Sequence, residues 1–214
     1  MDADVASRAA LHAALAEPIR LAIVDLLAIS DRSPKELGAM LDLGSNLLTH
    51  HLDVLAGVGL IERFTSAGDR RRRYVTLCRE PLAELGIATA RPAGEVLFVC
   101  SHNAARSQLA AALWTDLTGE PARSAGTTPA EQVHPGAVDA AARRGLDLGS
   151  AIPTRFGPGD DAAVVVTVCD RAHEELEVGE HWWHWSIPDP SISGSDAAFD
   201  AAVADLERRI RSVA

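Results

Sequence analysis

The pattern of apolar residues changes near residue 90, and this change constrains the fold more than any other feature. Upstream, apolar residues recur at three- and four-residue spacing, whereas downstream short apolar runs alternate with amphipathic segments. Between them, residues 80–95 contain two prolines and two glycines, a composition typical of a linker. The two patterns belong to different fold classes. We therefore expect a multidomain protein with a mainly α domain over 1–80, a linker over 81–94 and an α/β domain over 95–214.

Charge and cysteine content indicate which partners and which cellular compartment the chain can have. The 214 residues carry a formal net charge of −10, which argues against general nucleic-acid affinity but allows a local basic patch. Cys78, Cys100 and Cys169 form no Cys-x-x-Cys pair and are odd in number, as in a reducing compartment. No apolar run approaches the roughly 20 residues that cross a bilayer, and the N-terminus lacks a signal-peptide pattern. We expect a cytoplasmic protein with no membrane partner.

The first 80 residues contain the pattern of two short helices followed by a hairpin. Ser33, Pro34 and Glu36 have the spacing of an N-cap, a first-turn proline and a capping box. Residues 61–77 alternate apolar and polar residues around a turn, which predicts the hairpin. This order indicates a helix-turn-helix, whose second helix lies in the major groove. The buried stripe of that second helix is expected to consist of Leu47, Leu48, Leu52 and Leu55.

Polar and basic side chains in these elements are candidate DNA contacts. Four arginines begin the return strand of the hairpin, where a β-wing can contact phosphates beside the groove and make binding salt-dependent. A solvated hairpin tip is the alternative interpretation, because charge runs usually mark exposed surface. The candidate DNA-binding residues are Ser45, Asn46, Thr49, His50, Arg70, Arg71, Arg72 and Arg73.

Three segments, EPIRLAIVDLL, SPKELGAMLDL and LTHHLDVLAGVGLIE, together with this order of elements, resemble the winged helix-turn-helix domain of the ArsR/SmtB family. The resemblance implies a homodimer formed through the N-terminal domain and binding to palindromic operator DNA. Metal-sensing members often carry a cysteine pair in the helix before the turn, whereas KELGAML here has none. Cys78 is interpreted as a small buried residue, and the adjacent pair His50 and His51 cannot complete a coordination sphere. We therefore expect no metal site.

The loop CSHNAAR, residues 100–106, joins an apolar run to a helical pattern. At such a junction backbone N–H groups converge at the positive end of the helix dipole, which favours oxyanion binding. Arg106 adds a fork-shaped donor for two oxygens of the anion. The same field, with the Ser107 hydroxyl, is expected to stabilise the ionised sulfur of Cys100 as a nucleophile.

Two later segments supply candidate partners for this loop. Asp189 lies between Pro188 and Pro190, and a carboxyl group on such a rigid loop can protonate a departing oxygen. An Asp-Pro dipeptide by itself is more often only a turn. The apolar run after residue 161 predicts a buried strand that ends at Cys169 and Asp170, and ligands gather at this edge of open parallel sheets.

Residues 95–213 contain four segments, VLFVCSHNAARSQLA, SAGTTPAEQVHPGAVDAAARRGLDL, VVVTVCD and WSIPDPS, that resemble the low-molecular-weight protein tyrosine phosphatase fold, and within it the arsenate reductase branch. The resemblance implies a four-stranded parallel sheet with helices on both faces. It also implies that Cys100 is the nucleophile, Ser107 stabilises its thiolate, Asn103 holds the loop in shape and Asp189 is the acid. The oxyanion-binding residues implied are Ser101, His102, Asn103, Ala104, Ala105 and Arg106.

Several departures from the phosphatase pattern favour arsenate over phosphotyrosine. Gln108 follows Arg-Ser where phosphatases commonly have proline, His102 replaces the usual loop glycine, and no tyrosine follows Asp189. Thioredoxin-coupled reductases use two further cysteines; Cys169 stands where the second belongs, but residues 170–181 contain no third. Cys169 is therefore either a redox partner or an ordinary buried thiol. We expect no tightly bound cofactor, and a low-molecular-weight thiol (mycothiol or glutathione) or a thioredoxin-type reductant as co-substrate.

The two halves together predict a DNA-binding transcriptional regulator fused to a cysteine-dependent arsenate reductase that acts in the arsenic response. Operator DNA, an arsenate or phosphate oxyanion and a second copy of the chain are the expected partners. Two alternatives remain open. In one, the second domain only senses an oxyanion, since Ala104 and Ala105 lack hydroxyl or thiol groups often found in this loop. In the other, the same residues serve a phosphatase.

Overall fold

The computed structural model describes residues 3–84, 94–158, 160, 162, 164–176, 179 and 182–213. They fall into two compact units that divide near residue 89, with Ala67–Asp69 grouped with the second. The expected linker over 81–94 lies mostly outside the described residues, but residues 81–84 complete a helix, α5 (Arg79–Glu84). Among the described residues, no helix combines the length and apolarity that crossing a bilayer requires.

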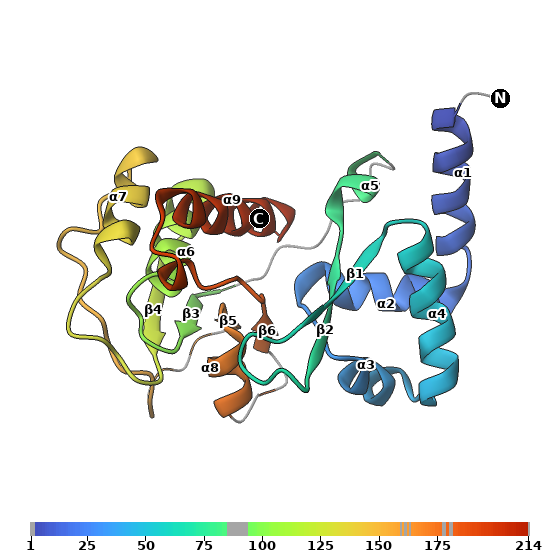
Figure 1. The fold of residues 1–214 in the computed structure, drawn as a ribbon, viewed down its shortest axis with the longest axis horizontal. Helices are drawn as coiled ribbons and strands as arrows, with labels where there is room; N and C mark the ends of the chain where they lie inside the picture. The colour runs from blue at the N-terminus through green and yellow to red at the C-terminus, as the bar shows by residue number, and fades with distance from the viewer. Residues whose placement is uncertain are drawn as a thin grey trace. The chain divides into compact units, whose positions relative to one another are not determined.

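The first unit contains helices around a leucine-rich core and one antiparallel hairpin (Figure 1). The predicted capping box is confirmed: the Ser33 N–H donates to Glu36 Oε2 at 2.7 Å, and the Glu36 N–H donates to Ser33 Oγ at 3.3 Å. The elements are α1 (Ala3–Leu15), α2 (Pro18–Ile29), α3 (Pro34–Leu41), α4 (Ser45–Gly57), β1 (Ile61–Thr65) and β2 (Arg73–Leu77).

Helix α4 buries one leucine face and exposes one polar face. Leu48, Leu52 and Leu55 are buried as predicted, but Leu47 is 47% exposed, so its assignment to the buried stripe was wrong. Neighbouring helix residues point about 100° apart, and the stripe that contains Leu48 therefore turns Leu47 toward solvent. The polar residues on the outer face, all exposed, are Ser45, Asn46, Thr49 and His50.

The hairpin pairs β1 with β2 from Ile61↔Leu77 to Thr65↔Arg73, which confirms its prediction. Only the last of the four arginines lies in the return strand; Arg70, Arg71 and Arg72 precede it in the turn, and all four are exposed. The segment before α3 pairs with the hairpin through a single residue, because Arg32 exchanges backbone hydrogen bonds of 3.2 and 2.8 Å with Val75. A one-residue pairing has no sequence period, so it could not be predicted from the pattern of residues.

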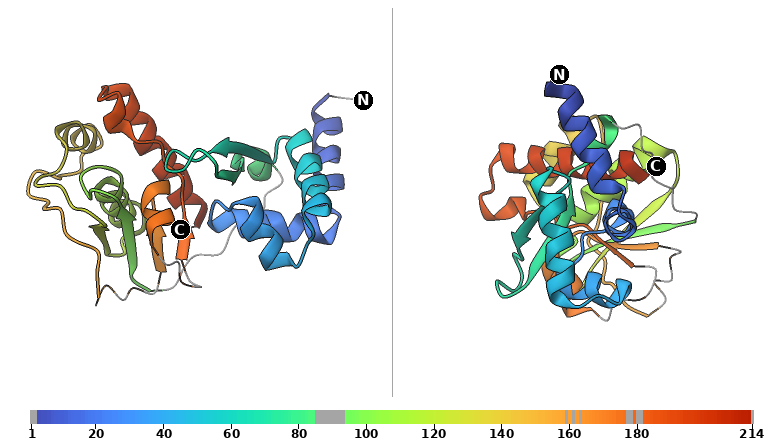
Figure 2. Two further views of the ribbon diagram at one scale, coloured as in Figure 1. Left: turned by 60° about the horizontal axis from the view of Figure 1, so that its bottom comes forward. Right: turned by 90° about the vertical axis from the view of Figure 1, so that its right-hand side faces the viewer.

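The second unit is built on a parallel sheet with strand order β4-β3-β5-β6, which confirms the predicted four-stranded parallel sheet. Helices α6 and α9 pack together above the sheet in Figure 1 and α8 lies below it, so both faces are covered (Figures 1 and 2). The elements are β3 (Val96–Cys100), α6 (Arg106–Thr118), β4 (Ala122–Gly126), α7 (Pro135–Arg143), β5 (Val164–Thr167), α8 (Asp170–Glu175), β6 (Trp182–His184), the 3₁₀ helix η1 (Pro190–Ile192) and α9 (Asp196–Val213).

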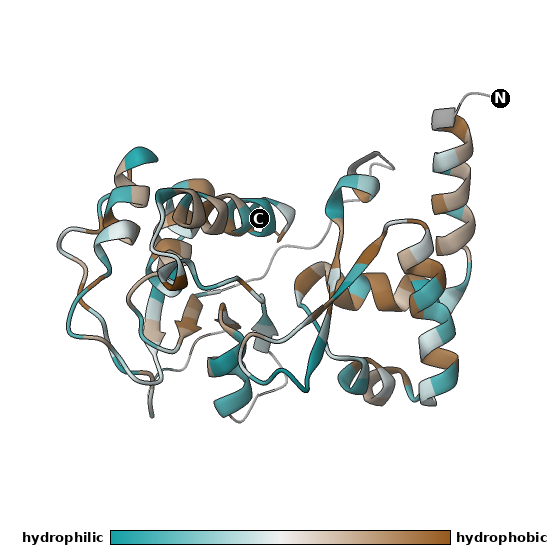
Figure 3. Ribbon diagram, in the orientation of Figure 1, coloured by the Kyte–Doolittle hydropathy of each residue, from teal (hydrophilic) through white to brown (hydrophobic). Residues whose placement is uncertain are grey.

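Strand β3 is the central element that presents the candidate nucleophile. All five of its residues are buried, and Phe98 packs against the rings of Trp114 and Trp185 with centroids 5.9 and 5.8 Å away. Figure 3 shows β3 as apolar and α8 as largely polar. The strand expected to end at Cys169 instead ends at Thr167, and Cys169 is the N-cap residue of α8. A rigid strand thus places Cys100 at the carboxyl edge of the sheet.

Candidate active site

Backbone hydrogen bonds fix the loop that follows Cys100. The carbonyl groups of Cys100, Ser101, His102 and Ala104 accept hydrogen bonds of 2.8–3.1 Å from four N–H groups of residues 127–134, which we call the bracing segment. Since the two ends of a peptide unit point in opposite directions, carbonyls turned outward leave the loop N–H groups directed inward. The loop therefore forms a cradle lined by N–H groups, the geometry that its sequence predicts.

The cradle ends at the N-terminus of α6. Its N-cap residue, Ala105, provides no side-chain hydrogen bond, so the side chain at this position does not cap the positive end of the helix dipole. Gly126 of β4 lies directly outside the loop; a Cβ atom there would come within 2.8 Å of the Asn103 nitrogen and 2.9 Å of the Ser101 oxygen. A glycine is needed at this position because the two backbones approach so closely.

Two polar groups, the Asn103 N–H and the Ser107 hydroxyl, face the sulfur of Cys100. The Asn103 N–H donates to Cys100 Sγ at 3.2 Å, and Ser107 Oγ lies 3.0 Å from the same sulfur. Asn103 is fully buried and has a positive φ of 48°, a left-handed conformation that asparagine tolerates better than most residues. Donors directed at sulfur stabilise its ionised form, so this geometry suits a thiolate nucleophile.

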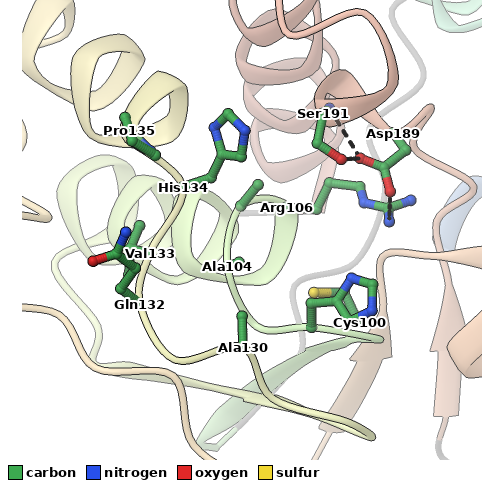
Figure 4. Close-up of a pocket in the computed structure, with 12 residues that line it drawn as sticks. Cys100, Ala104, Arg106, Ala130, Gln132, Val133, His134, Pro135, Asp189 and Ser191 are labelled. Atoms are coloured by element: carbon green, nitrogen blue, oxygen red, sulfur yellow. Dashed lines mark hydrogen bonds and ion pairs between the residues drawn. The ribbon is translucent and has the colours of Figure 1, made fainter.

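Arg106 and Asp189 form an ion pair on the opposite side of the cradle (Figure 4). Arg106 Nη2 lies 2.6 Å from Asp189 Oδ2, and Arg106 Nη1 donates to the Ile187 carbonyl at 3.1 Å. The Ser191 N–H and hydroxyl donate to the other carboxylate oxygen of Asp189 at 3.0 and 2.6 Å. These contacts orient the guanidinium and the carboxyl group beside the same space above Cys100.

The local environment controls the protonation of Asp189. Partial burial acts to raise the pKa of Asp189, but attraction to Arg106 and hydrogen bonds from Ser191 prevail and hold it below the ordinary value. Asp189 is thus a carboxylate at neutral pH.

A cavity of about 270 Å³ opens above the cradle. Figure 4 shows the bracing segment along one wall and Arg106 with Asp189 on the other. None of the lining residues is Phe, Tyr or Trp, so no large aromatic ring is available to stack on a substrate. The lining consists of Cys100, His102, Ala104, Ala105, Arg106, Ala130, Gln132, Val133, His134, Pro135, Asp189 and Ser191.

The structure therefore brings most of the predicted catalytic and oxyanion-binding residues to one cavity. The predicted residues Ser101, Asn103 and Ser107 are buried and do not line the cavity. Asn103 Nδ2 donates to Ser107 Oγ at 2.8 Å. Cys169 is 2% exposed, and its sulfur lies 3.3 Å from Ser101 Oγ. Sequence reasoning did not find the bracing segment, because its contribution comes from backbone groups. Among the described residues, no group of three His, Cys, Asp or Glu side chains is arranged to hold a metal ion.

Asp170 lies next to Cys169 but belongs to a separate buried network. Its Oδ1 atom is 3.2 Å from His184 Nε2 and accepts a hydrogen bond from the Ser186 hydroxyl at 2.5 Å. The His184 ring stacks on His173 with centroids 4.1 Å apart. Burial acts to raise the pKa of Asp170, but hydrogen bonds from His184 and Ser186 outweigh it and lower the pKa to about 2.

We expect Asp170 to make folding sensitive to acid. Because its pKa falls from 3.8 to about 2 on folding, its contribution is fully present above pH 4 and is lost as the pH drops toward 2. The loss should be on the order of 2 kcal/mol in the free energy of unfolding. Urea unfolding followed by tryptophan fluorescence measures it. Asp170→Asn should be less stable than wild type at neutral pH and should lack this acid-dependent loss, whereas the exposed control Asp200→Asn should retain it. Equal acid dependence in wild type and Asp170→Asn would contradict the assignment.

Comparison with known proteins identifies the second unit. Residues 95–214 match the family described as low molecular weight phosphotyrosine protein phosphatase. The chain belongs to this family. Family membership supports a cysteine-based phosphatase or arsenate reductase activity, and the match does not extend into the first unit.

Several solved structures are similar to the low molecular weight phosphatase domain. The low molecular weight protein tyrosine phosphatase from T. tengcongensis is 20% identical with a TM-score of 0.51, covering 56% of this chain and 97% of that one. The tyrosine phosphatase Wzb from Escherichia coli K30, solved with sulphate, is 22% identical with a TM-score of 0.50, covering 55% and 93%. An arsenate reductase from Archaeoglobus fulgidus DSM 4304 is 31% identical with a TM-score of 0.46, covering 54% and 95%. At their level of identity, the first two show the shared fold.

Proposed function

We propose that the second unit is a thiol-dependent arsenate reductase whose nucleophile is Cys100, and that the first unit is a winged helix-turn-helix that binds operator DNA. The observation that carries the enzymatic part is the position of Cys100 Sγ at the base of the N–H-lined cradle, beside Arg106 and Asp189. Attack on a tetrahedral oxyanion requires a sulfur nucleophile, anion-binding donors and an acid, and this cavity holds a candidate for each.

The cavity lining favours arsenate over phosphotyrosine. The wall near the cradle carries the small side chains Ala104, Ala130 and Val133, and Ser191 lines the cavity beside Asp189. Such a wall lacks the ring partners that would recognise a phenyl group. A volume of about 270 Å³ exceeds that of one tetrahedral oxyanion, so a thiol co-substrate has room to approach the sulfur. The family's phosphatase chemistry remains the alternative for this cavity.

In the first proposed step the thiolate of Cys100 attacks arsenic(V). An S–As bond forms and one As–O bond breaks; the leaving oxygen takes the proton of Asp189 and departs as water. Binding of the dihydrogen or monohydrogen arsenate engages Arg106 and places negative charge beside Asp189, which raises the proton affinity of its carboxylate. The anion or the Cys100 thiol supplies the proton to Asp189 before the As–O bond breaks.

In the second step a low-molecular-weight thiolate such as mycothiol or glutathione attacks the sulfur of Cys100. An S–S bond forms, the electron pair of the S–As bond stays on arsenic, and arsenic(V) is reduced to arsenite. A second thiol then releases Cys100 as thiolate, so two thiols are oxidised to one disulfide for each arsenate. Cys169 replaces one of these thiols if it acts as the redox partner, and its burial behind Ser101 places it beside the cradle.

Arsenate turnover by the purified full-length chain tests the enzymatic proposal. We expect thiol-dependent release of arsenite with mycothiol, glutathione or a thioredoxin system, measured by arsenic speciation. The assay is repeated with p-nitrophenyl phosphate. Hydrolysis of that ester far faster than arsenate reduction would favour a phosphatase. If arsenate protects Cys100 from alkylation but is not reduced, the result would instead favour an oxyanion sensor.

The DNA-binding proposal rests on the order of elements and on exposure in the first unit. Helix α4 follows α3 after a short turn and exposes Ser45, Asn46, Thr49 and His50 on one face. The hairpin that follows carries four exposed arginines. Asp53 on α4 pairs with Arg63 of β1 at 2.8 Å, so this carboxylate is neutralised beside the proposed DNA-contacting face. We further propose a homodimer through this unit, which light scattering of the purified protein tests.

Removal of the hairpin arginines should weaken DNA binding and its salt dependence. Each arginine that neutralises a phosphate contributes about 0.9 to the slope of log affinity against log salt, so replacing Arg70–Arg73 with alanine should reduce the slope by about 3 to 4. Fluorescence anisotropy with a labelled mixed-sequence duplex measures the slope. A control with the same charge change replaces four arginines of the second unit: Arg143, Arg144, Arg208 and Arg211. Equal slopes for both variants would contradict wing contact.

A further inference from the structure

We infer that Gln108 is a positioning residue that sets the direction of the Ser107 hydroxyl toward Cys100, a role that rests on the proposed use of Cys100 as nucleophile. Gln108 lies in the first turn of α6 and is 7% exposed, so its amide is held within the protein. It does not line the cavity above Cys100. Its influence on the sulfur must therefore pass through other residues.

The first step concerns the orientation of the Asn103 side chain. Asn103 Oδ1 accepts a hydrogen bond from the backbone N–H of Thr154 at 2.8 Å. A backbone N–H can only donate, so the atom that faces it must be the carbonyl oxygen of the Asn103 amide. The opposite atom of that amide is then Nδ2, which lies 2.8 Å from Ser107 Oγ. The amide orientation follows from the bonding partners.

The second step concerns the Ser107 hydroxyl. Because Nδ2 of Asn103 is a donor, Ser107 Oγ accepts this hydrogen bond and keeps its own single proton to donate. Cys100 Sγ lies 3.0 Å from Ser107 Oγ and is positioned to receive that proton as a hydrogen bond. A reversed Asn103 amide would offer Ser107 an oxygen acceptor in competition with the sulfur, so the orientation of Asn103 determines how well the thiolate is solvated.

Gln108 completes this arrangement from the far side. Its Nε2 atom donates to Asn103 Oδ1 at 3.1 Å and lies 3.4 Å from the Ile152 carbonyl oxygen. Two acceptors facing one amide nitrogen match its two N–H bonds. Gln108 thus supplies a second donor to Asn103 Oδ1 and ties α6 to residues 152–154. Without it, Asn103 would depend on the Thr154 N–H alone to keep Nδ2 directed at Ser107.

The test is the pH dependence of Cys100 alkylation by iodoacetamide in the full chain, followed by peptide mass spectrometry. Gln108→Met keeps the length of the side chain and removes both donors. We expect it to move the midpoint of the rate profile upward and to lower the Cys100 rate at mildly acidic pH about three- to tenfold. Thr115→Val, also on α6, removes a hydroxyl that donates within the helix to the Ala111 carbonyl, and should leave the profile unchanged.

A change shared equally by both variants, or by neither, would overturn the inference. Urea unfolding separates a local effect from lost stability, and if Gln108→Met does not fold, Gln108→Asn, which keeps an amide too short to reach Asn103, carries the same expectation. If wild-type Cys100 itself titrates like an exposed cysteine, the proposed function fails; if wild type is activated and the Gln108 variants match it, only this inference fails. The charged and titratable groups that line the cavity with Cys100 are unchanged in every variant: His102, Arg106, His134 and Asp189.

Discussion

Cys100→Ser should abolish arsenate reduction, with kcat/KM lower by about 10⁴-fold or more. A serine hydroxyl is far less acidic than a thiol, so the cradle can still hold an anion but no adequate nucleophile faces it. The variant should also form no covalent arsenic adduct. Arsenite release under saturating thiol measures turnover, and intact-protein mass spectrometry after rapid quenching detects the adduct.

The matched control for this change is Cys78→Ser, the same substitution in the first unit, which should keep full turnover. Phosphate binding to Cys100→Ser, measured by calorimetry, tests whether the cradle persists without the sulfur. Turnover by Cys100→Ser within tenfold of wild type would exclude Cys100 as the nucleophile. Loss of activity in both serine variants would indicate nonspecific damage and would remove the support that the experiment gives to the mechanism.

Arg106→Lys should lower kcat/KM for arsenate by about 10³-fold although the charge is retained. The guanidinium contacts both the Ile187 carbonyl and Asp189 while it faces the cradle, and a single ammonium group cannot match this geometry. We expect a higher KM because Arg106 is proposed to bind the anion, and a lower kcat because it is proposed to release Asp189 from its ion pair. Steady-state kinetics at neutral pH measures the two constants.

The control for Arg106 is Arg155→Lys, the same substitution at an exposed arginine that bonds the Thr127 carbonyl at 3.0 Å and does not line the cavity. Its kinetics should match wild type within a factor of about two to three, as for most surface changes. Asp189→Asn combined with Arg106→Lys should cost less than the sum of the two single changes, because the two groups act as a pair. Strict additivity would count against the coupling of Arg106 to Asp189.

The sequence predicted those parts of the fold that depend on local periodicity. The capping box at Ser33 and the hairpin over 61–77 follow from short-range chemistry, and both are present. Leu47 was misassigned because the buried stripe of α4 includes only one of the two adjacent leucines, and the sequence does not say which one. The strand β5 was extended by two residues too many, since an apolar run continues through Val168 into the cap of α8.

For the candidate site, the sequence predicted the loop residues and Asp189, but not the contacts that hold the loop in place. Cys100 through Ser107 form one loop and helix start, so spacing alone places them together. The contacts between Gln108, Asn103 and Thr154 join the loop and first turn of α6 to residues 152–154, and no pattern within one segment encodes them. The role of the bracing segment could not be predicted for another reason: its contacts use main-chain atoms that every residue possesses.

That main-chain bracing also separates two properties of the site. The proposed anion binding depends on the course of the backbone through residues 100–106, which is held by main-chain contacts and not by the side chains of Ala130 and Gln132. Those side chains border the space where the remainder of a substrate or a thiol would sit. Substitutions along this wall can therefore change which reactant the protein accepts, while the backbone proposed to bind the anion keeps its course.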